Sequence, residues 1–569
     1  GTGTGVVLPE GAQRLVFKKE GYEQITVPPP VLPKADYEPV PVSAFSALVQ
    51  PAMEGVPHLN RIQSKVFPVG YKTGNNMLVC APTGAGKTEV AMMCVLRQVE
   101  QCVTARGGLD LEDLKIVYVA PMKALASEVT DKFSKRLSRL GVRVKELTGD
   151  TQLTRKDISD TQMLVVTPEK WDVITRKSAD AALTSLVKLL IIDEIHLLNE
   201  ERGSVIEAIV ARTLRQVESS QQQIRIVGLS ATLPTYKDVA VFLRVNVARD
   251  LFYFDSSYRP VPLETCFVGV MGSNINKVKA SMNEICYKKV LDRVKQGYQV
   301  MVFVHSRKDT AKTARTLLEL AERDNTTGVF DVSEHAQYDM QHRVVEKSKN
   351  KELRELFVGG FGVHHAGMLR SDRNLTEKLF AMGLIKVLFC TATLAWGVNL
   401  PAHSVVIKGT QIYDAKQGKF VELSILDVMQ IFGRAGRPQF DSSGEGIILT
   451  THDKLAHYMQ LMHAALPIES TLQQALTDHL NAEVVLGSVR TLKEAVAWLS
   501  YTYLYVRMLR NPTHYGVAFH EIQADPTLAV RCRELIEGSI KELARAKMLR
   551  YNFETQNMNT TETGIVASH

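Results

Sequence analysis

Short apolar runs alternate with longer stretches of helical periodicity through most of this 569-residue chain. The alternation occurs twice, once over residues 55–255 and again over residues 275–455. The apolar runs are Lys115–Val119, Met163–Val166, Leu189–Ile192 and Ile224–Leu229 in the first region, and Val300–Val304, Ile385–Phe389, Ser404–Ile407 and Gly446–Leu449 in the second. Strands that alternate with helices predict a parallel sheet covered by helices on both faces. The chain is therefore predicted to hold two α/β domains in tandem, joined near Arg259-Pro260-Val261-Pro262.

The pattern changes at both ends of the chain. Residues 1–45 are rich in proline and valine, including Pro28-Pro29-Pro30, and predict an extended arm. After residue 460 the strand-like runs stop, and a helical spacing of apolar positions marks one buried face at Leu492, Ala495, Val496, Leu499 and Tyr503. We expect an arm over 1–45, α/β domains over 46–260 and 261–458, and a mostly helical domain over 459–569 that is cut short at its C-terminal end.

Composition narrows the class only slightly. Hydrophobic residues make up 45% and charged residues 23%, as in ordinary soluble proteins, and a net charge of +7 permits nucleic-acid binding without arguing for it. No run approaches the length of a membrane helix, so no membrane partner is expected. Seven cysteines without a CxxC pair suit a reducing compartment, the nucleus or cytoplasm.

The most informative motif is Ala-Pro-Thr-Gly-Ala-Gly-Lys-Thr over residues 81–88, between an apolar run and a helical pattern. Strand, loop and helix in this order make a P-loop, although Ala81 stands where glycine usually opens the motif. Backbone N–H groups favour phosphates, the lysine reaches the β- and γ-phosphates, and the threonine holds Mg²⁺. The motif predicts that a nucleoside triphosphate and Mg²⁺ bind at Thr83, Gly84, Ala85, Gly86, Lys87 and Thr88.

Two further motifs carry groups that hydrolysis needs. Asp193 and Glu194 end an apolar run, and we interpret the first as a metal ligand and the second as the base for water; the alternative is an acidic pair at a helix N-terminus. Gln430, Arg434 and Arg437 lie in the second α/β region, where the arginines can neutralise charge on the γ-phosphate; the alternative is a surface ion pair.

Gln63, which lies N-terminal to the P-loop, bears on the choice of nucleotide. The amide of Gln63 can pair with both edges of adenine and would favour ATP, although an ordinary helix or turn position is the alternative.

Together these motifs resemble the superfamily 2 helicases, and more narrowly the Ski-type group. The resemblance rests on the P-loop, Asp193-Glu194-Ile195-His196, Ser230-Ala231-Thr232 and Gln430–Arg437, with further matches at 120–125, 167–172, 304–307, 364–368 and 391–401. It implies two tandem RecA-like domains with ATP between them, followed by a winged helix. Gly397 and Asn399 match a nucleotide contact of the second domain.

The resemblance also implies a path for single-stranded nucleic acid, gripped through its backbone. The matching positions are Pro121, Lys123, Thr167, Lys170 and Trp171 on the first domain and Arg307, His365, Thr391 and Thr393 on the second. For His365 and Trp171, ordinary packing is the alternative. Ser230 and Thr232 match positions that couple hydrolysis to movement, with a strand-end turn as the alternative.

A segment over residues 409–421 has two strand-like runs around a glycine-containing turn, which predicts a hairpin. In the family a hairpin at this place splits the incoming duplex, so we expect the same here.

The resemblance implies an ATP-dependent 3′–5′ helicase acting on single-stranded and duplex DNA or RNA. Within the group the chain is most similar to one cassette of the tandem-cassette helicases. Two kinds of member compete: subunits of cointegrator-type complexes, with roles in DNA alkylation repair and ribosome quality control, and spliceosomal RNA helicases. The sequence looks more like the first kind, which implies other cointegrator subunits as partners. A non-catalytic scaffold is the alternative of another class, although all the catalytic positions are in place.

Overall fold

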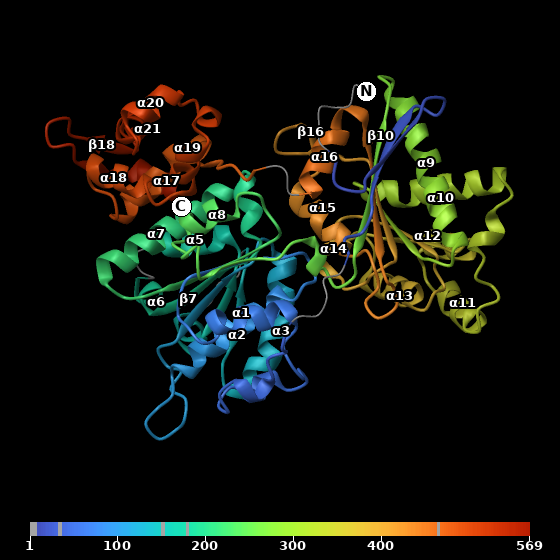
Figure 1. Ribbon diagram of the computed structural model, residues 1–569, viewed down its shortest axis with the longest axis horizontal. Coiled ribbons are helices and arrows are strands. Elements are labelled where there is room, and N and C mark those ends of the chain that lie inside the picture. Colours follow the sequence, from blue (N-terminus) through green and yellow to red (C-terminus); the bar gives the residue numbers. More distant parts are fainter. Residues whose placement is uncertain (1–7, 32–36, 150–153, 178–180, 464–466) are drawn as a thin grey trace. The chain divides into compact units, whose positions relative to one another are not determined.

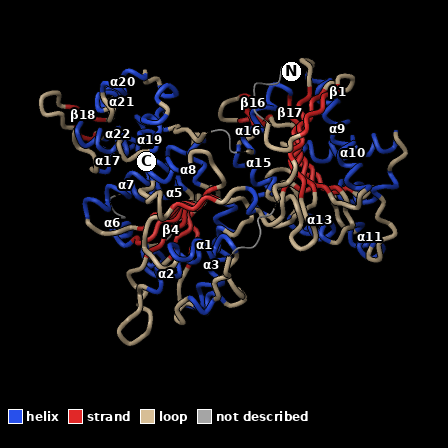
Figure 2. The backbone as a smooth tube through the Cα atoms, viewed as in Figure 1, coloured by secondary structure: helices blue, strands red, loops and turns tan. Residues whose placement is uncertain are grey.

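The computed structural model describes residues 8–31, 37–149, 154–177, 181–463 and 467–569, with the backbone alone at 181 and 182. It divides into two compact units, Gly1–Pro33 with Ser256–Leu466, and Lys34–Asp255 with Pro467–His569. Figure 2 shows the larger sheet of each unit as a group of strands surrounded by helices. Each unit is described by itself below.

The unit formed by Lys34–Asp255 and Pro467–His569 contains the first α/β domain. Its seven-stranded sheet has the order β5-β6-β4-β7-β8-β3-β9, and every neighbouring pair is parallel. The strands are β3 (Met77–Cys80), β4 (Lys115–Val119), β5 (Val144–Leu147), β6 (Met163–Val166), β7 (Val187–Ile192), β8 (Arg225–Ser230) and β9 (Leu251–Tyr253). The helices are α1 (Arg61–Gly70), α2 (Lys87–Glu100), α3 (Lys123–Leu137), α4 (Arg155–Asp160), α5 (Pro168–Arg176), α6 (Ala181–Leu186), α7 (Gly203–Ser220) and α8 (Tyr236–Phe242).

The same unit contains a mostly helical domain that packs on α5, α7 and α8 (Figure 1). Its elements are α17 (Leu472–Leu486), α18 (Leu492–Leu499), α19 (Tyr503–Arg510), α20 (Phe519–Ala524), α21 (Ala529–Arg545), β18 (Leu549–Tyr551), β19 (Met558–Thr560) and α22 (Glu562–Ser568). Its core includes Leu492, Ala495, Trp498 and Leu499 of α18. The predicted single apolar face is interrupted, because α18 ends at Leu499 and Tyr503 begins α19.

The other unit has an eight-stranded sheet in the order β1-β2-β10-β17-β14-β11-β13-β12. Its strands are β1 (Gln13–Phe17), β2 (Tyr22–Val27), β10 (Leu263–Val270), β11 (Val300–Phe303), β12 (Phe361–His364), β13 (Val387–Cys390), β14 (Ser404–Lys408) and β17 (Gly444–Thr451). Its helices are α9 (Ile275–Lys295), α10 (Arg307–Arg323), α11 (Tyr338–Glu346), α12 (Lys351–Val358), α13 (Arg370–Ala381), α14 (Thr393–Gly397), α15 (Ile425–Phe432) and α16 (Leu455–Met462). A separate two-stranded hairpin joins β15 (Gln411–Asp414) to β16 (Lys419–Glu422).

The N-terminal arm belongs to this second sheet. Strands β1 and β2 pair antiparallel, and β2 pairs antiparallel with β10, so that Thr26 lies opposite Cys266. The remaining pairs, from β10 to β12, are parallel. The arm predicted from its prolines therefore adds two strands at one side of the sheet, with β1 at the edge.

The prediction of two parallel-sheet α/β domains followed by a helical domain is confirmed. The central strands are buried on both faces, as β3 and β13 show along their whole length. Such strands consist of continuous apolar residues, which is why they could be found in the sequence.

Candidate nucleotide and nucleic-acid site

The P-loop leads from β3 into the first turn of α2. Gly84 and Gly86 have φ values of +82° and +101°, in the left-handed region that glycine adopts without strain. No side chain caps the N-terminus of α2 among the described residues, so its first N–H groups are available to an anion. Lys87 folds back over the loop, where its Nζ donates to the carbonyl of Ala81 at 2.6 Å.

The first turn of helix α1 and its N-cap residue hold the backbone of the P-loop. Asn60 and Gln63 form a capping box, and their side-chain amides donate to the carbonyls of Ala85 at 2.9 Å and Gly86 at 3.1 Å. A Cβ atom on Gly86 would lie 2.5 Å from Gln63 Nε2. In this structure Gln63 thus shapes the phosphate loop, and its predicted contact with adenine stays a prediction.

The acid pair follows β7, two strands from β3 in the sheet. Tyr118 donates to Asp193 Oδ2 at 2.6 Å, and the N–H of Glu194 donates to Asp193 Oδ1 at 2.8 Å. Burial and the neighbouring Glu194 carboxylate raise the pKa of Asp193, and burial raises the pKa of Glu194, while the charge of Lys87 opposes both shifts. Glu194 has a left-handed backbone, with φ of 53°, which is uncommon outside glycine and asparagine.

His196 connects the acid pair to the predicted coupling motif. Its Nε2 lies 3.1 Å from Glu194 Oε2, and its Nδ1 accepts a hydrogen bond from the N–H of Ala231 at 3.4 Å. Burial and the charge of Lys87 lower the pKa of His196 to about 3, so the ring is neutral and the accepting Nδ1 places its proton on Nε2. Ser230 is fully buried, and its hydroxyl donates to the carbonyl of Ala231, while Thr232 is half-buried.

These residues fit a Mg²⁺-bound nucleoside triphosphate. The uncapped end of α2 and the left-handed backbone at Gly84 and Gly86 suit phosphates. A cation beside Asp193 would offset the burial and the Glu194 charge that raise the pKa of Asp193. When bound, Mg²⁺ neutralises charge on the β- and γ-phosphates. Thr88 and Asp193 would hold it, Lys87 would bind the phosphates, and Glu194 would orient and deprotonate water.

The predicted strand contacts of this domain lie at the carboxyl edge of the same sheet. Pro121 and Lys123 follow β4, whereas Thr167 and Lys170 follow its neighbour β6. Arg202 ties the two loops together, because it donates to the carbonyl of Pro121 and to the carboxylate of Glu169, each at 2.5 Å. The structure therefore brings these four residues to adjacent strand ends.

Trp171 is placed differently from the other predicted contacts. It is only 3% exposed and lines a cavity of about 420 Å³ bounded by α5, α7 and α17. Burial of this kind favours the packing alternative for Trp171.

The arginine motif lies at the end of α15 in the other unit. Arg434 donates to the carbonyl of Ala395 and, at 3.2 Å, to Asn399 Oδ1, which joins two of the predicted nucleotide contacts. Arg437 donates from its backbone and guanidinium to Asp441, at 2.7 Å from the backbone N–H. Gln430 is half-buried on α15, and Gly397 is exposed at the end of α14.

A buried arginine supports this motif. Arg259 donates to the carbonyls of Val261, Phe432 and Ala435, the last two at 2.9 Å. Burial lowers the pKa of Arg259 to about 10. The linker residue thus fixes the backbone that leads into the arginine pair.

The predicted strand contacts of this unit also meet at one sheet edge. Arg307, His365, Thr391 and Thr393 follow β11, β12 and β13, which are neighbours in the order β11-β13-β12. The hydroxyls of Thr391 and Thr393 lie 3.0 Å apart, and Arg307 is close enough to His365 to contribute, after burial, to lowering its pKa. The structure therefore gathers all four.

The predicted hairpin over 409–421 is confirmed as the pair β15–β16. Tyr413 lies directly opposite Phe420, and their rings meet edge to face with centroids 5.5 Å apart. Both side chains are exposed, Tyr413 by 59% and Phe420 by 65%. An exposed aromatic pair on a polar hairpin is suited to stacking on a base.

Sequence reasoning missed five supporting residues. His196 stood inside a quoted motif, but Tyr118, Arg202 and Asp441 carried no signal, and Arg259 was taken only as part of a linker. Tyr118, Arg202 and Arg259 contact partners distant in the chain, so spacing could not reveal them, whereas Asp441 lies only four residues after Arg437 but outside a helix. In the described part of the chain, no helix is long and apolar enough to cross a membrane.

Comparison with known families gives the class. Residues 60–239 match the family described as DEAD/DEAH box helicase, residues 342–439 match the helicase conserved C-terminal domain, and residues 469–552 match a winged helix-turn-helix domain. Over its two α/β domains the chain is thus similar to DEAD/DEAH-box helicases, and over its helical domain to a winged helix-turn-helix.

Individual relatives narrow the resemblance to cointegrator-type helicases. The chain is 58% identical to the DExH-box ATP-dependent RNA helicase DExH14 of Arabidopsis thaliana, covering 99% of this chain and 26% of the relative. It is 54% identical to activating signal cointegrator 1 complex subunit 3 of Homo sapiens, covering 100% of this chain and 26% of the relative, and 54% identical to that of Danio rerio, covering 99% and 37%. The chain thus spans about a quarter to a third of the curated relatives it matches.

Solved structures agree on the fold. The DUF1998 helicase MrfA bound to DNA is similar with a TM-score of 0.58 and 17% identity, over 95% of this chain and 62% of that one. The structure of MrfA with DNA and AMPPNP gives the same TM-score and identity, over 96% and 65%.

Proposed function

We propose that this chain couples ATP hydrolysis to 3′–5′ movement along a single strand and thereby separates duplex nucleic acid. The observation that carries the proposal is the sharing of one sheet edge in the first α/β domain. The P-loop, coupling motif and acid pair follow β3, β8 and β7, whereas the strand contacts follow β4 and β6. A rearrangement at the nucleotide can therefore reach the strand grip through one rigid sheet.

Each residue has a proposed task in that cycle. Lys87 and Thr88 bind phosphate and metal, Asp193 binds the metal, and Glu194 activates water. In the other unit, Arg434 and Arg437 would stabilise the charge that develops during hydrolysis.

His196 is proposed to connect hydrolysis to movement. Its ring lies against both Glu194 and the backbone of Ala231, next to Ser230 and Thr232. A change at the γ-phosphate that moves Glu194 would therefore shift His196 and, through it, the coupling motif Ser230–Thr232.

The test is strand displacement from duplexes with a 3′ or a 5′ single-stranded overhang. We expect ATP-dependent displacement with the 3′ overhang alone, and none for the Glu194→Gln variant, which should still bind ATP. Displacement that starts equally well from a 5′ overhang would contradict the polarity.

The hairpin is proposed to part the duplex. Replacing Tyr413 and Phe420 by Ala removes the exposed aromatic pair but leaves the polar β15–β16 backbone. We expect strand displacement to fall about tenfold, on the order of one base-stacking contact, while ATP hydrolysis stimulated by single strands is retained. Equal loss of both activities would refute a separating role.

RNA is the strand favoured by one specific observation. The relative at 58% identity is named an RNA helicase, while the structural neighbours that support the fold were solved with DNA. Contacts to the phosphates alone do not distinguish RNA from DNA, because both strands carry the same phosphate groups. Parallel assays with RNA and DNA single strands decide by comparing stimulation of ATP hydrolysis.

We also propose that this chain acts as a helicase module of a cointegrator-type complex, active in nucleus and cytoplasm, in alkylation repair and ribosome quality control. The support is 54% identity to activating signal cointegrator 1 complex subunit 3 over the whole of this chain. Affinity purification of the full-length protein tests this role. Recovery of splicing particles in place of cointegrator subunits would favour the spliceosomal alternative.

A further inference from the structure

The helix α5 connects the strand grip to the winged-helix domain. At its N-terminal end it follows Thr167 and contains Lys170, two of the proposed nucleic-acid contacts. Two residues after Lys170, Asp172 is 4% exposed and pairs with Arg212 of α7. The position of the grip therefore depends on what holds α5.

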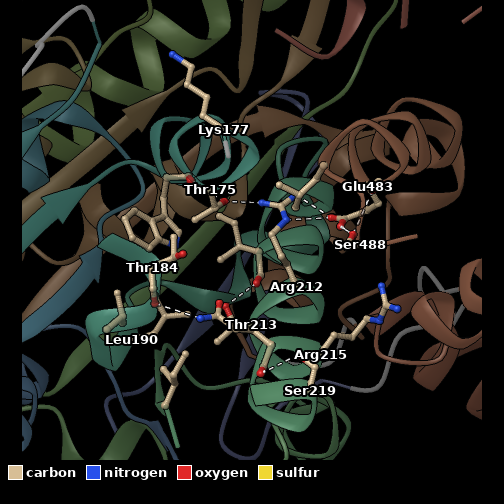
Figure 3. A pocket seen from close by; sticks show the side chains of 16 residues that line it. Thr175, Lys177, Thr184, Leu190, Arg212, Thr213, Arg215, Ser219, Glu483 and Ser488 are labelled. Atoms are coloured by element: carbon tan, nitrogen blue, oxygen red, sulfur yellow. Dashed lines mark hydrogen bonds and ion pairs between the residues drawn. The ribbon is translucent and has the colours of Figure 1, made fainter. Parts of the chain in front are cut away.

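Arg212 joins α5 to the winged helix through a buried ionic cluster. Its Nη1 donates to Asp172 Oδ1 at 3.0 Å and to Thr175 Oγ1 at 2.5 Å, while its Nε and Nη2 donate to Glu483 Oε1 at 3.0 and 2.8 Å. Figure 3 shows Arg212 with Thr175 on one side and Glu483 of α17 on the other. Glu483 is 1% exposed, so the cluster is shielded from solvent.

A second attachment uses the other carboxylate oxygen of Asp172. Arg176 Nη2 lies 2.7 Å from Asp172 Oδ2, and Arg176 Nη1 donates to the carbonyl of Ser568 at the end of α22 at 3.0 Å. Two residues of the winged-helix domain, Glu483 and Ser568, are thus connected to one carboxylate on α5.

The cavity of about 420 Å³ lies beside this cluster. Among the described residues, Trp171 and Thr175 of α5, Arg212 and Glu483 all line it. Side chains that border a cavity lack packing partners on that side, so α5 gains less there from dispersion contacts. Arg202 holds the first turn of α5 through Glu169, and the Arg212 cluster is the directional constraint beside the cavity.

We propose that Arg212 is a positioning residue through which the docked winged helix sets α5 in the orientation that grips the strand. This inference rests on the proposed function, since it assigns α5 a role in strand binding. Removing Arg212 leaves the carboxylates of Asp172 and Glu483 without their shared partner, and α5 would shift or tilt over the cavity.

The same domain junction offers a matched control. Arg507 of α19 is 6% exposed and pairs with Asp238 of α8 at 2.5 Å and with Glu469 at 3.2 and 2.5 Å. This cluster is also buried and also joins the winged helix to the α/β domain. Helix α8, however, contains no proposed strand contact. Loss of the Arg507 cluster should therefore weaken docking of the winged helix without disturbing the strand contacts on α5.

The experiment compares Arg212→Met with Arg507→Met in the complete chain. Fluorescence anisotropy of labelled RNA and DNA single strands measures affinity, and steady-state kinetics give the KM for ATP. We expect Arg212→Met to weaken strand binding about tenfold, within the range for residues that couple sites indirectly, with the KM for ATP unchanged. Arg507→Met should lower Tm comparably and leave strand affinity within about twofold.

If either methionine variant does not fold, the conservative variants Asp172→Asn and Asp238→Asn are compared instead, with the same measurement of strand affinity. Equal strand affinity in the two variants of a pair would overturn the inference, because the effect would then follow general docking or be absent. A wild-type chain that binds no strand would overturn the proposed function, and the inference with it.

Discussion

Glu207 should make docking of the winged helix dependent on pH. This carboxyl is fully buried on α7, with Ser470 Oγ 2.6 Å from Oε2 and the N–H of Leu504 donating to Oε1 at 2.7 Å. No basic side chain hydrogen-bonds to it among the described contacts, and burial raises its pKa to about 8. Its neutral form is therefore the one that the docked state favours.

The sign and size of the effect follow from linkage. The pKa of Glu207 is raised in the folded chain, so its contribution to stability is complete below the ordinary value of 4.5 and is lost as pH rises through about 8. The limiting slope for one proton is about 1.4 kcal/mol per pH unit, which amounts to about 2 kcal/mol between pH 6 and pH 8. For a unit of this size, that loss corresponds to a Tm decrease of about 3 °C.

The perturbation is Glu207→Gln, which mimics the protonated acid and keeps both hydrogen-bond partners. Scanning calorimetry at pH 6 and pH 8 should show that the variant loses less Tm than the wild type over this range. Subtracting the two pH responses cancels the titration of His196, Asp193 and the other groups that both proteins share. An identical pH response in the two proteins would show that Glu207 is charged when docked, and would refute the reasoning.

Glu469 provides the opposite case at the same junction. Burial alone would raise its pKa, but hydrogen bonds from Arg507, Tyr515 and Asn511 outweigh burial and lower it. Its charged form stabilises the junction, so Glu469→Gln should lower Tm at both pH values. Glu469→Gln therefore tests the loss of a buried charge, whereas Glu207→Gln tests the loss of a buried titrating proton.

Two further predictions concern the nucleotide-binding elements. Gly86→Ala places a Cβ 2.5 Å from Gln63 Nε2 at a φ of +101°, and should weaken binding of a fluorescent ATP analogue by at least about tenfold, on the order of 1.4 kcal/mol; Gly84→Ala, where no atom lies within 4 Å, is the milder control. Arg259→Met leaves the carbonyls of Val261, Phe432 and Ala435 without their donor and should cost about 3 kcal/mol in urea unfolding. A loss under about 1 kcal/mol would show that the linker arginine does not fix the arginine motif.

The parts of the fold that could be predicted are those whose residues carry the signal themselves. Lys115–Val119 and Met163–Val166 coincide with β4 and β6, because a buried parallel strand must be apolar on both faces. The pairing of β2 with β10 could not be predicted, since it joins residues some 240 positions apart, as Thr26 and Cys266 show. The sequence of the arm specifies an extended chain but not its neighbour.

The site divides in the same way. Lys87, Asp193 and Arg434 could be predicted because a nucleotide site requires fixed residue types at fixed spacings. Trp171 was a weaker prediction, because tryptophan beside a strand serves packing as readily as stacking on a base. Arg212 could not be found at all, because its importance comes from partners on α5 and α17, 40 and 271 positions away.

The buried charges of the winged-helix junction suggest what the junction is for. Buried ion pairs add little net stability compared with apolar packing of the same volume, but breaking one is costly. A junction that contains the Arg212 and Arg507 clusters gains orientation more than strength. Orientation is what a strand grip on α5 needs, because contacts to successive phosphates fail when the helix that presents them tilts. The same reasoning explains why Asp172 is engaged by two arginines, one from α7 and one from α5 itself.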